Sequence, residues 1–186
     1  MHGDPDLPTA ASRTYRFLSQ FKDELERRSS YRRYQKGKPY WSVWTTGTYT
    51  FSRYKVLWKE MSGGRFAVAY IGAYPDALLG EKLVIPDHKL YFVPVDTEDE
   101  AAYLTALLNS PTISGAVSAY AAQLSLGTSV VEYLNIPAFA PSNSLHQQLT
   151  ELAKAITRRG GMPQNTEFRE LDRLTTEMLV LEKGCD

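Results

Sequence analysis

The sequence has a single cysteine, Cys185, and no long apolar run. One cysteine excludes an intramolecular disulfide and a metal site built from several thiolates. A membrane-spanning helix needs about 18 or more consecutive apolar residues, and no such stretch occurs. Residues 1–11 also lack the basic start and apolar middle of a secretory signal. We therefore expect a cytoplasmic protein with no membrane partner.

The motifs of several common enzyme classes are missing as well. No Gly-x-Gly-x-x-Gly follows a strand pattern, no Gly-Lys-Ser/Thr phosphate loop is present, and no Gly-x-Ser-x-Gly occurs. The three histidines, His2, His88 and His146, are far apart and have no metal-ligand spacing. The sequence thus indicates no catalytic residue, no cofactor and no metal in this segment, and leaves open whether the chain acts as an enzyme.

The pairs Pro75-Asp76 and Pro86-Asp87 raise a metal-dependent hydrolase as an alternative. Its ligands would be Asp76, Glu81 and Asp87. Such a nuclease needs a Glu-x-Lys pattern on a following strand, so that a carboxylate and a lysine converge on one metal and one water. Glu81 and Lys82 are adjacent and would project to opposite faces of a strand. The pattern therefore favours turns at both Pro-Asp pairs.

The composition is that of an ordinary globular protein. The 186 residues are 43% hydrophobic and 23% charged, which suffices for one core with a helical appendage. The formal net charge of +0 hides an asymmetry, because residues 1–60 hold 12 basic and 6 acidic side chains while residues 61–186 hold 9 and 15. The excess of positive charge is therefore concentrated near the N-terminus.

Six basic residues follow one another between positions 27 and 38 without an acidic residue: Arg27, Arg28, Arg32, Arg33, Lys36 and Lys38. Aromatic residues interleave with them and follow them: Tyr31, Tyr34, Tyr40, Trp41 and Trp44. Basic groups neutralise phosphates and release counterions, and aromatic rings stack on bases that leave the duplex. The pattern favours a nucleic-acid surface over the other interpretation, a solvated helix end that complements the helix dipole.

Hydrophobic periodicity and turn residues predict the elements. Helices are expected at 9–29, from Thr97 to 108, from Pro111 to 122, at 142–159 and at 167–183. Strands are expected at 40–46, 54–60, 66–71 and 90–95, with shorter ones at 83–85 and 130–134, and a basic loop at 30–39. Ser62-Gly63-Gly64 reads as the turn of a hairpin between the strands at 54–60 and 66–71.

This order predicts an α+β fold, with a twisted, mostly antiparallel sheet flanked by helices and a C-terminal antiparallel helix pair. We expect residues 1–9 to be disordered, residues 10–140 to form an α+β domain, and residues 141–186 to form a helical hairpin that packs on it.

Several stretches in this order resemble the C-terminal target-recognition region of adenine-specific DNA methyltransferases of restriction-modification systems. The most specific is Leu104-Thr-Ala-Leu-Leu-Asn-Ser110. The others are Thr14–Arg28, Tyr40-Trp41, Lys55–Glu60, Ile85-Pro-Asp87 with Leu90–Val93, Tyr133–Pro137, and Pro141 followed by a helix containing His146 and Leu149. The resemblance covers roughly residues 14–157 and depends on the order of these stretches, because each motif alone is common.

The resemblance implies a domain that recognises a sequence in double-stranded DNA for a methyltransferase catalytic domain in the same or another chain. That domain would bind S-adenosylmethionine and would carry an Asn/Asp-Pro-Pro-Tyr/Phe motif for the flipped adenine. Neither the cofactor motif nor the adenine motif is present here, and the nearest candidate, Asn135-Ile136-Pro137, lacks the second proline and the aromatic residue. A DNA adenine methyltransferase is therefore the expected parent protein, and this segment is expected to be non-catalytic.

The expected phosphate contacts are Arg27, Arg28, Arg32, Arg33, Lys36 and Lys38, and the expected base-proximal residues are Tyr40, Trp44, Lys55 and Arg65. Loops at 62–65 and 72–80 are the expected places for groups that read bases. A second hypothesis remains open: a protein-interaction module that docks another subunit through its C-terminal helices, with the basic segment serving only solubility.

Overall fold

The computed structural model describes residues 4–59, 66–121 and 134–183. The chain divides into two compact units, Met1–Phe51 and Ser52–Asp186, and each unit is described by itself. The predicted domain boundary at residues 140 and 141 falls inside the second unit. The predicted strand at 130–134 and the loop at 62–65 lie largely outside the described residues.

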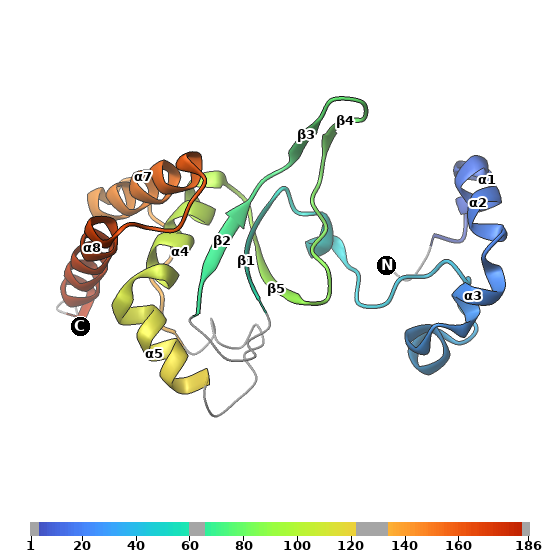
Figure 1. The fold of residues 1–186 in the computed structure, drawn as a ribbon, viewed down its shortest axis with the longest axis horizontal. Coiled ribbons are helices and arrows are strands. Elements are labelled where there is room, and N and C mark those ends of the chain that lie inside the picture. The colour runs from blue at the N-terminus through green and yellow to red at the C-terminus, as the bar shows by residue number, and fades with distance from the viewer. Residues whose placement is uncertain (1–3, 60–65, 122–133, 184–186) are drawn as a thin grey trace. The chain divides into compact units, whose positions relative to one another are not determined.

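The first unit is built from short helical segments (Figure 1). They are α1 (Leu7–Ala10), α2 (Ser12–Ser19), α3 (Lys22–Arg27), a π-helical turn η1 (Tyr31–Gln35) and a 3₁₀ turn η2 (Thr48–Phe51). Where one helix was predicted over 9–29, the chain leaves the helical conformation at Ala11 and Phe21. Residues 7–9, predicted to be disordered, belong to a helical turn whose N–H groups at Thr9 and Ala10 donate to the Asp6 carbonyl at 3.0 and 2.8 Å.

The second unit contains a three-stranded antiparallel sheet in the order β2-β1-β5, formed by β1 (Tyr54–Lys59), β2 (Val68–Ile71) and β5 (Leu90–Val95). Val56 of β1 is opposite Tyr70 on one side and Val93 on the other. The antiparallel pairing of β1 with β2 confirms the predicted hairpin between them. A separate hairpin joins β3 (Tyr74–Asp76) to β4 (Gly80–Lys82). Residues 83–85 are not in a strand, so the short strand predicted there is wrong.

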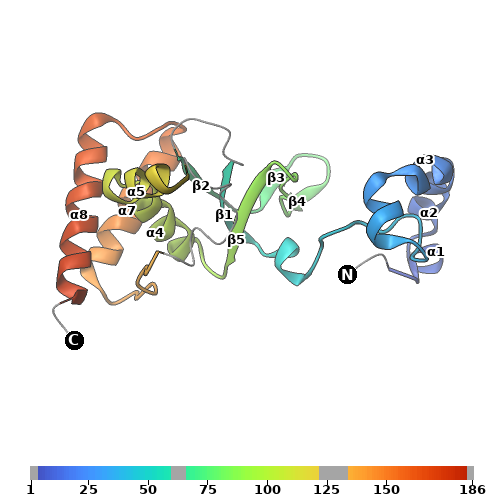
Figure 2. The same cartoon turned by 90° about the horizontal axis from the view of Figure 1, so that it is seen from below.

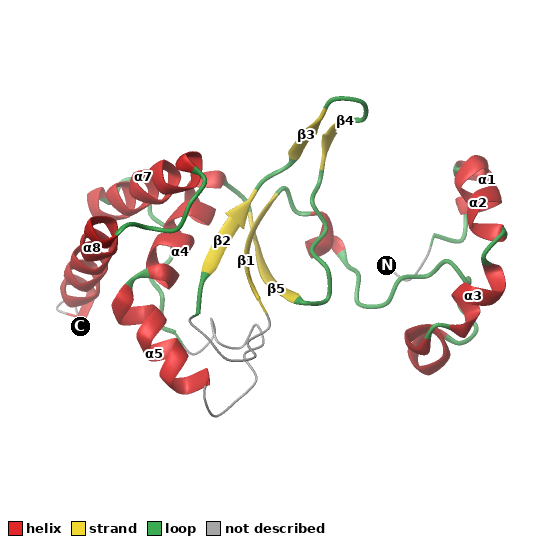
Figure 3. Cartoon of the chain, viewed as in Figure 1, coloured by secondary structure: helices red, strands yellow, loops and turns green. Residues whose placement is uncertain are grey.

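The described residues of this unit also form the helices α4 (Glu98–Asn109), α5 (Pro111–Ala121), α7 (Ser144–Arg159) and α8 (Asn165–Lys183). Two perpendicular views show them gathered on one side of the sheet (Figures 1 and 2), and Figure 3 separates helices from strands by colour. Their ends follow sequence signals. Thr97 Oγ1 accepts from the Glu100 N–H at 3.1 Å at the start of α4, and Asn143 Oδ1 accepts from the Leu145 N–H at 2.9 Å at the start of α7.

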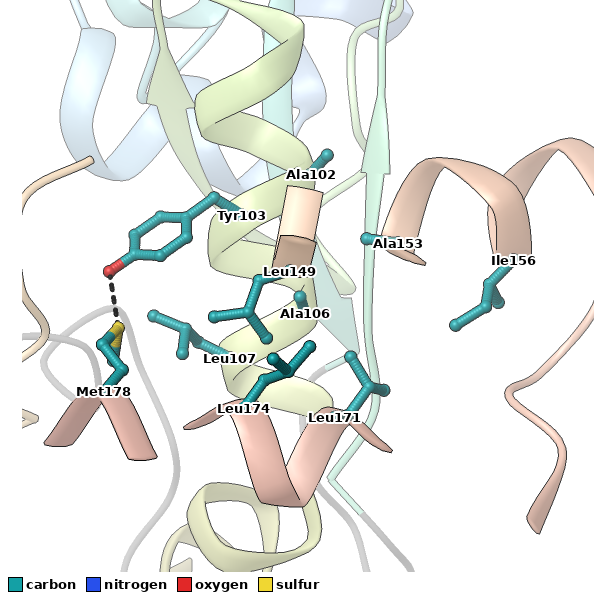
Figure 4. Packing of buried hydrophobic residues seen from close by; sticks show 10 residues of the cluster. All are labelled: Ala102, Tyr103, Ala106, Leu107, Leu149, Ala153, Ile156, Leu171, Leu174 and Met178. Atoms are coloured by element: carbon teal, nitrogen blue, oxygen red, sulfur yellow. Dashed lines mark hydrogen bonds between the residues drawn. The ribbon is translucent and has the colours of Figure 1, made fainter. Parts of the chain in front are cut away.

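Helix α4 lies between the sheet and the two C-terminal helices. On one side, Ala101 and Leu108 join a cluster with Val56, Trp58, Phe66, Val68, Val95 and Val117. On the other side, Ala102, Tyr103, Ala106 and Leu107 meet Leu149, Ala153, Ile156, Leu171, Leu174 and Met178 (Figure 4). A helix covered on both sides must be apolar nearly all round, which accounts for the run of alanine and leucine in α4.

The Leu-Asn-Ser ending of α4 has a structural role. Asn109 Oδ1 accepts from the Val68 N–H at 3.0 Å and its Nδ2 donates to the Val68 carbonyl at 2.7 Å, so its amide pairs with strand β2 as a neighbouring strand would. Ser110 Oγ accepts from the Ile113 N–H at 3.3 Å at the start of α5. Asn109 therefore joins α4 to the sheet, and Ser110 joins α4 to α5.

His146, expected to cap or pack rather than to act as a base, is 1% exposed. Its ring lies 4.5 Å from that of Tyr103 and 6.2 Å from that of Phe139, and its Nδ1 accepts from the Ala140 N–H at 3.0 Å. Its interpretation as a packing residue is confirmed.

The link between α7 and α8 is held by an ion pair between Arg159 and Glu167, which leads to a first testable prediction. Gly160, with φ 75°, ends α7 in the left-handed conformation. Arg159 Nη1 and Nη2 donate to the two carboxylate oxygens of Glu167 at 2.9 and 2.8 Å, and Glu167 Oε2 also accepts from the Gln164 N–H at 2.6 Å. Arg159, and then this N–H, lower the pKa of Glu167.

We expect Glu167→Gln to lower the free energy of unfolding by about 1 kcal/mol at neutral pH, because it removes a charged cap. A lowered pKa means that the carboxylate stabilises the fold above its ordinary pKa and that this contribution disappears as the pH falls through the lowered value. Urea unfolding of both proteins should show a gap that closes on acidification. Glu177→Gln is the matched control, because its exposed ion pair lies within α8 and is worth less than about 0.5 kcal/mol. An equal loss in both variants, or a gap that persists in acid, would contradict this account.

The predicted α+β class is confirmed by the antiparallel sheet, the helices that cover it and the C-terminal pair α7 and α8. Among the helices of the described segments, none is both long enough and apolar enough to cross a bilayer.

Candidate nucleic-acid interface

The backbone from Tyr40 to Ser42 is held by the guanidinium group of Arg28. Its Nη2 donates to the Tyr40 and Ser42 carbonyls at 2.7 and 2.9 Å, and its Nε donates to the Leu25 carbonyl at 2.9 Å. In a sheet, carbonyls accept from the N–H groups of a neighbouring strand, whereas here a side chain satisfies them. The strand predicted at 40–46 is wrong. Arg28 is engaged within its own unit, so we remove it from the phosphate-contacting set.

Tyr40 belongs to an aromatic cluster rather than to the surface. It is 8% exposed, and its hydroxyl lies 2.9 Å from Ser19 Oγ. Its ring is 4.8 Å from that of Trp41 and 6.5 Å from that of Tyr15, with Tyr15 and Trp41 in edge-to-face contact at 5.4 Å. These rings join α2 to the segment after η1. Tyr40 therefore supports the unit and is not placed to contact a base.

Five basic side chains of the segment are exposed: Arg27, Arg32, Arg33, Lys36 and Lys38. We call them the exposed cations. Across the described parts of the chain, no acidic group lies within ion-pair distance of any of them. Residues 1–51 carry nine basic and five acidic side chains, a net charge of +4. The exposed cations are therefore available to neutralise phosphates.

Tyr34 and Trp44 form a parallel aromatic stack. Their ring centroids are 4.5 Å apart with an interplanar angle of 16°, and the two residues are 51% and 42% exposed. The guanidinium carbon of Arg33 lies 5.9 Å from the centroid of the Tyr34 ring, within the range of a cation–π interaction. The prediction from sequence included Trp44 but not Tyr34. The Tyr-Arg-Arg-Tyr run at 31–34 was the available signal, since it brings an aromatic ring next to the basic groups.

The turn that carries Arg32, Arg33 and Tyr34 is π-helical, a geometry that is frequent at functional sites. Gln35 closes it at 1% exposure, and neither atom of its amide has a hydrogen-bond partner in the described structure. The π-helical geometry is consistent with a functional role for the residues that the turn presents.

The remaining predicted base-proximal residues lie elsewhere. Lys55 is 1% exposed on β1, and its Nζ donates to the carbonyl of Ser52. Burial lowers the pKa of this ammonium group. Its place in the interior corrects the expectation that it contacts DNA. Arg65 lies outside the described residues.

The acidic residues of the alternative hydrolase site have structural partners. Asp76 Oδ1 accepts from the N–H groups of Leu78 and Leu79 at 2.9 and 2.7 Å and so closes the β3–β4 turn. Glu81 receives both Nη groups of Arg53 at 2.6 and 2.8 Å, and this pairing lowers the pKa of Glu81. Asp87 accepts from the Lys89 N–H at 3.1 Å. Within the described ranges, no group of three or more His, Cys, Asp or Glu side chains converges as a metal site would require.

A hollow of about 210 Å³ opens in the second unit where β2 and α4 meet the link between α7 and α8. Val68, Ala106, Ile156 and Leu171 contribute to its lining, and no charged side chain does. It is smaller than the roughly 300–1,000 Å³ of typical ligand pockets. It offers neither an acid–base pair nor groups that would hold a charged cofactor.

Exposed cations adjoin an exposed aromatic stack in residues 27–44, which are the candidate nucleic-acid interface. The resemblance to methyltransferase recognition regions stays a prediction. The chain matches no protein-family model, no curated protein and no solved structure.

Proposed function

We propose that this chain is a DNA-sequence recognition domain of an adenine-specific DNA methyltransferase or combined restriction-modification enzyme, and is itself non-catalytic. The observation that carries the proposal is the set of exposed cations in residues 27–38, a stretch without an acidic residue. Such groups bind the phosphates of double-stranded DNA through counterion release, which gives affinity and orientation without reading the sequence.

The methyltransferase context comes from the resemblance. A catalytic domain in the same or another chain would bind S-adenosylmethionine and transfer the methyl group, while this domain holds the duplex over that active site. Sequence reading requires side chains on rigid supports that reach base edges. The protruding β3–β4 hairpin, whose turn is closed by Asp76, is such a support. We place the protein in the cytoplasm, where it meets DNA.

The test is a titration of the full chain with short fluorescent duplexes at increasing salt. We expect binding whose logarithm falls linearly with the logarithm of salt concentration, with a slope of about −0.9 for each phosphate neutralised, hence about −4 to −5 for all the exposed cations. Absence of duplex binding at low salt, with the chain alone and with a methyltransferase catalytic domain added, would refute the proposal.

A second candidate function is an interaction module that docks another subunit through the C-terminal helices. The observation in its favour is the exposure of Val180 and Leu181 in α8, at 65% and 59%. Adjacent apolar side chains on a helix are suited to a protein partner. Reversing the charge of the exposed cations separates the two functions, because it should abolish DNA binding and leave subunit docking unchanged.

A further inference from the structure

Among the aromatic contacts of the first unit, the cluster of Tyr15, Tyr40 and Trp41 differs from the pair of Tyr34 and Trp44 in geometry and exposure. Tyr15, Tyr40 and Trp41 meet at tilted or edge-to-face angles of 40° to 87°, and Tyr40 is buried. Tyr34 and Trp44 are nearly parallel at 16° and are about half exposed. The first group is the packing of a small core. The second keeps two large flat rings at the surface, where core packing does not account for them.

The surroundings of this parallel stack are those of a nucleic-acid ligand. Arg32 and Arg33 are exposed and directly precede Tyr34 in η1, and the exposed Lys36 and Lys38 follow it within four residues. Arg33 adds a planar cation 5.9 Å from the Tyr34 centroid. A platform of aromatic rings next to basic groups is the combination that binds bases and backbone together in single strands.

The geometry of the duplex limits what such a platform can accept. In uninterrupted double-stranded DNA each base is already stacked on its neighbours, so its flat face is hidden. Phosphate contacts form with paired and unpaired strands alike, whereas stacking on Tyr34 and Trp44 is open only to a base that has left the helix. The exposed cations and the aromatic stack therefore differ in which form of nucleic acid they recognise.

We propose that Tyr34 and Trp44 form a stacking site for an unpaired nucleobase, so that residues 27–44 bind a single strand, or a duplex with an unpaired base, more tightly than an uninterrupted duplex. This inference rests on the proposed nucleic-acid function and specifies its ligand. The feature that this site would recognise is an unstacked base on a phosphate backbone, and both single-stranded DNA and RNA have it.

The experiment compares the full chain with its Trp44→Ala and Tyr34→Ala variants on four fluorescent probes of equal length. These are a DNA strand, an RNA strand, an uninterrupted DNA duplex, and a duplex with one unpaired 2-aminopurine. Stacking on an aromatic side chain is worth about 5- to 100-fold in affinity per base. We expect a loss of that size on the single strands and the interrupted duplex, and a change of less than about twofold on the uninterrupted duplex, where only phosphates are contacted. The 2-aminopurine fluorescence should be quenched by the parent chain and not by Trp44→Ala.

Two controls separate stacking from folding and from charge. Phe17→Ala removes an exposed aromatic side chain of the same unit that pairs with Phe21 instead, and it should bind all probes as the parent does. Trp44→Phe keeps a flat ring and should retain most of the single-strand affinity. A loss confined to DNA or to RNA would assign the source of the base and would support the site.

A loss of equal size on the single strands and on the uninterrupted duplex would overturn the stacking site, and so would unchanged single-strand affinity in both alanine variants. In these cases, salt-dependent duplex binding by the parent chain would still support the DNA-binding function. A parent chain that binds none of the probes at low salt, alone and with a methyltransferase catalytic domain added, would refute both proposals.

Discussion

Replacing the exposed cations by glutamine is expected to weaken duplex binding by at least about a hundredfold at moderate salt. The variant carries Arg27→Gln, Arg32→Gln, Arg33→Gln, Lys36→Gln and Lys38→Gln. Each of these side chains is exposed, and glutamine replaces it by a shorter, uncharged polar side chain, so the main change is the loss of positive charge. The measurement is the dissociation constant of a fluorescent duplex at several salt concentrations.

The salt dependence is the sharper part of this prediction. If all five side chains contact phosphates, their loss should make the slope of log K against log salt less negative by about 4 to 5. A smaller change in this slope would show how many of the five side chains contact phosphates. Affinity lost with no change in slope would mean that the cations act on folding rather than on phosphates, and would contradict the proposed interface.

A matched control removes the same number of exposed positive charges elsewhere in the chain. It carries Arg16→Gln, Lys59→Gln, Lys82→Gln, Arg158→Gln and Arg169→Gln, all at exposed positions. Net charge falls equally in both variants, so a general electrostatic attraction would weaken both alike. We expect the control to keep most of the affinity and slope of the parent chain. Equal losses would show that net charge, rather than the segment from 27 to 38, governs binding.

Arg28 differs from the exposed cations although it belongs to the same basic run. It is adjacent in sequence to Arg27, yet its guanidinium is occupied by three backbone carbonyls. The sequence could not separate these two arginines, because both belong to one basic run and the difference depends on where the backbone from Tyr40 to Ser42 returns. Hydrogen bonds to charged groups are worth about 1.5–3 kcal/mol, which is enough to decide this conformation over a weak strand preference.

In the second unit, several helix ends and strands agree with those predicted from the sequence. Thr97, Pro111 and Asn143 stand at helix starts as their types predict, and Gly160 ends α7. Such signals are local, since each depends on one side chain and the backbone groups of the next turn. The strands at 54–59 and 90–95 were predictable for a related reason: β-branched and aromatic residues fit a half-buried pleated surface.

Features that depend on distant contacts were not predictable. Lys55 appeared to be a surface cation but lies in the interior, because its strand is central in the sheet and the Ser52 carbonyl receives its ammonium group. The stack of Tyr34 on Trp44 joins residues ten positions apart with no regular element between them. The boundary at Phe51 lies near the shift from basic to acidic composition, but its position follows only from how the chain contacts itself.

Leu149→Ala is expected to lower the free energy of unfolding by about 3–5 kcal/mol and the melting temperature of the second unit by roughly 10 °C or more. Leu149 is 0% exposed and lies where α7 meets α4, in the cluster that includes Leu107, Leu171 and Leu174 (Figure 4). Helices α4, α7 and α8 all contribute to this cluster, so a cavity there weakens several interfaces together. The measurement is calorimetric or urea unfolding of the full chain.

Leu152→Ala is the matched control, because it makes the same chemical change on the same helix at a half-buried position. It should cost about 1–2 kcal/mol, in proportion to the smaller apolar area lost. The exposed cations belong to residues 1–51, so below the melting transition the Leu149→Ala chain should bind a duplex as the parent chain does. If its affinity fell together with its stability, DNA binding would depend on the second unit, and the interface proposed for residues 27–44 would have to extend to it. Equal destabilisation by the two substitutions would instead show that α7 packs less tightly on α4 than the burial of Leu149 implies.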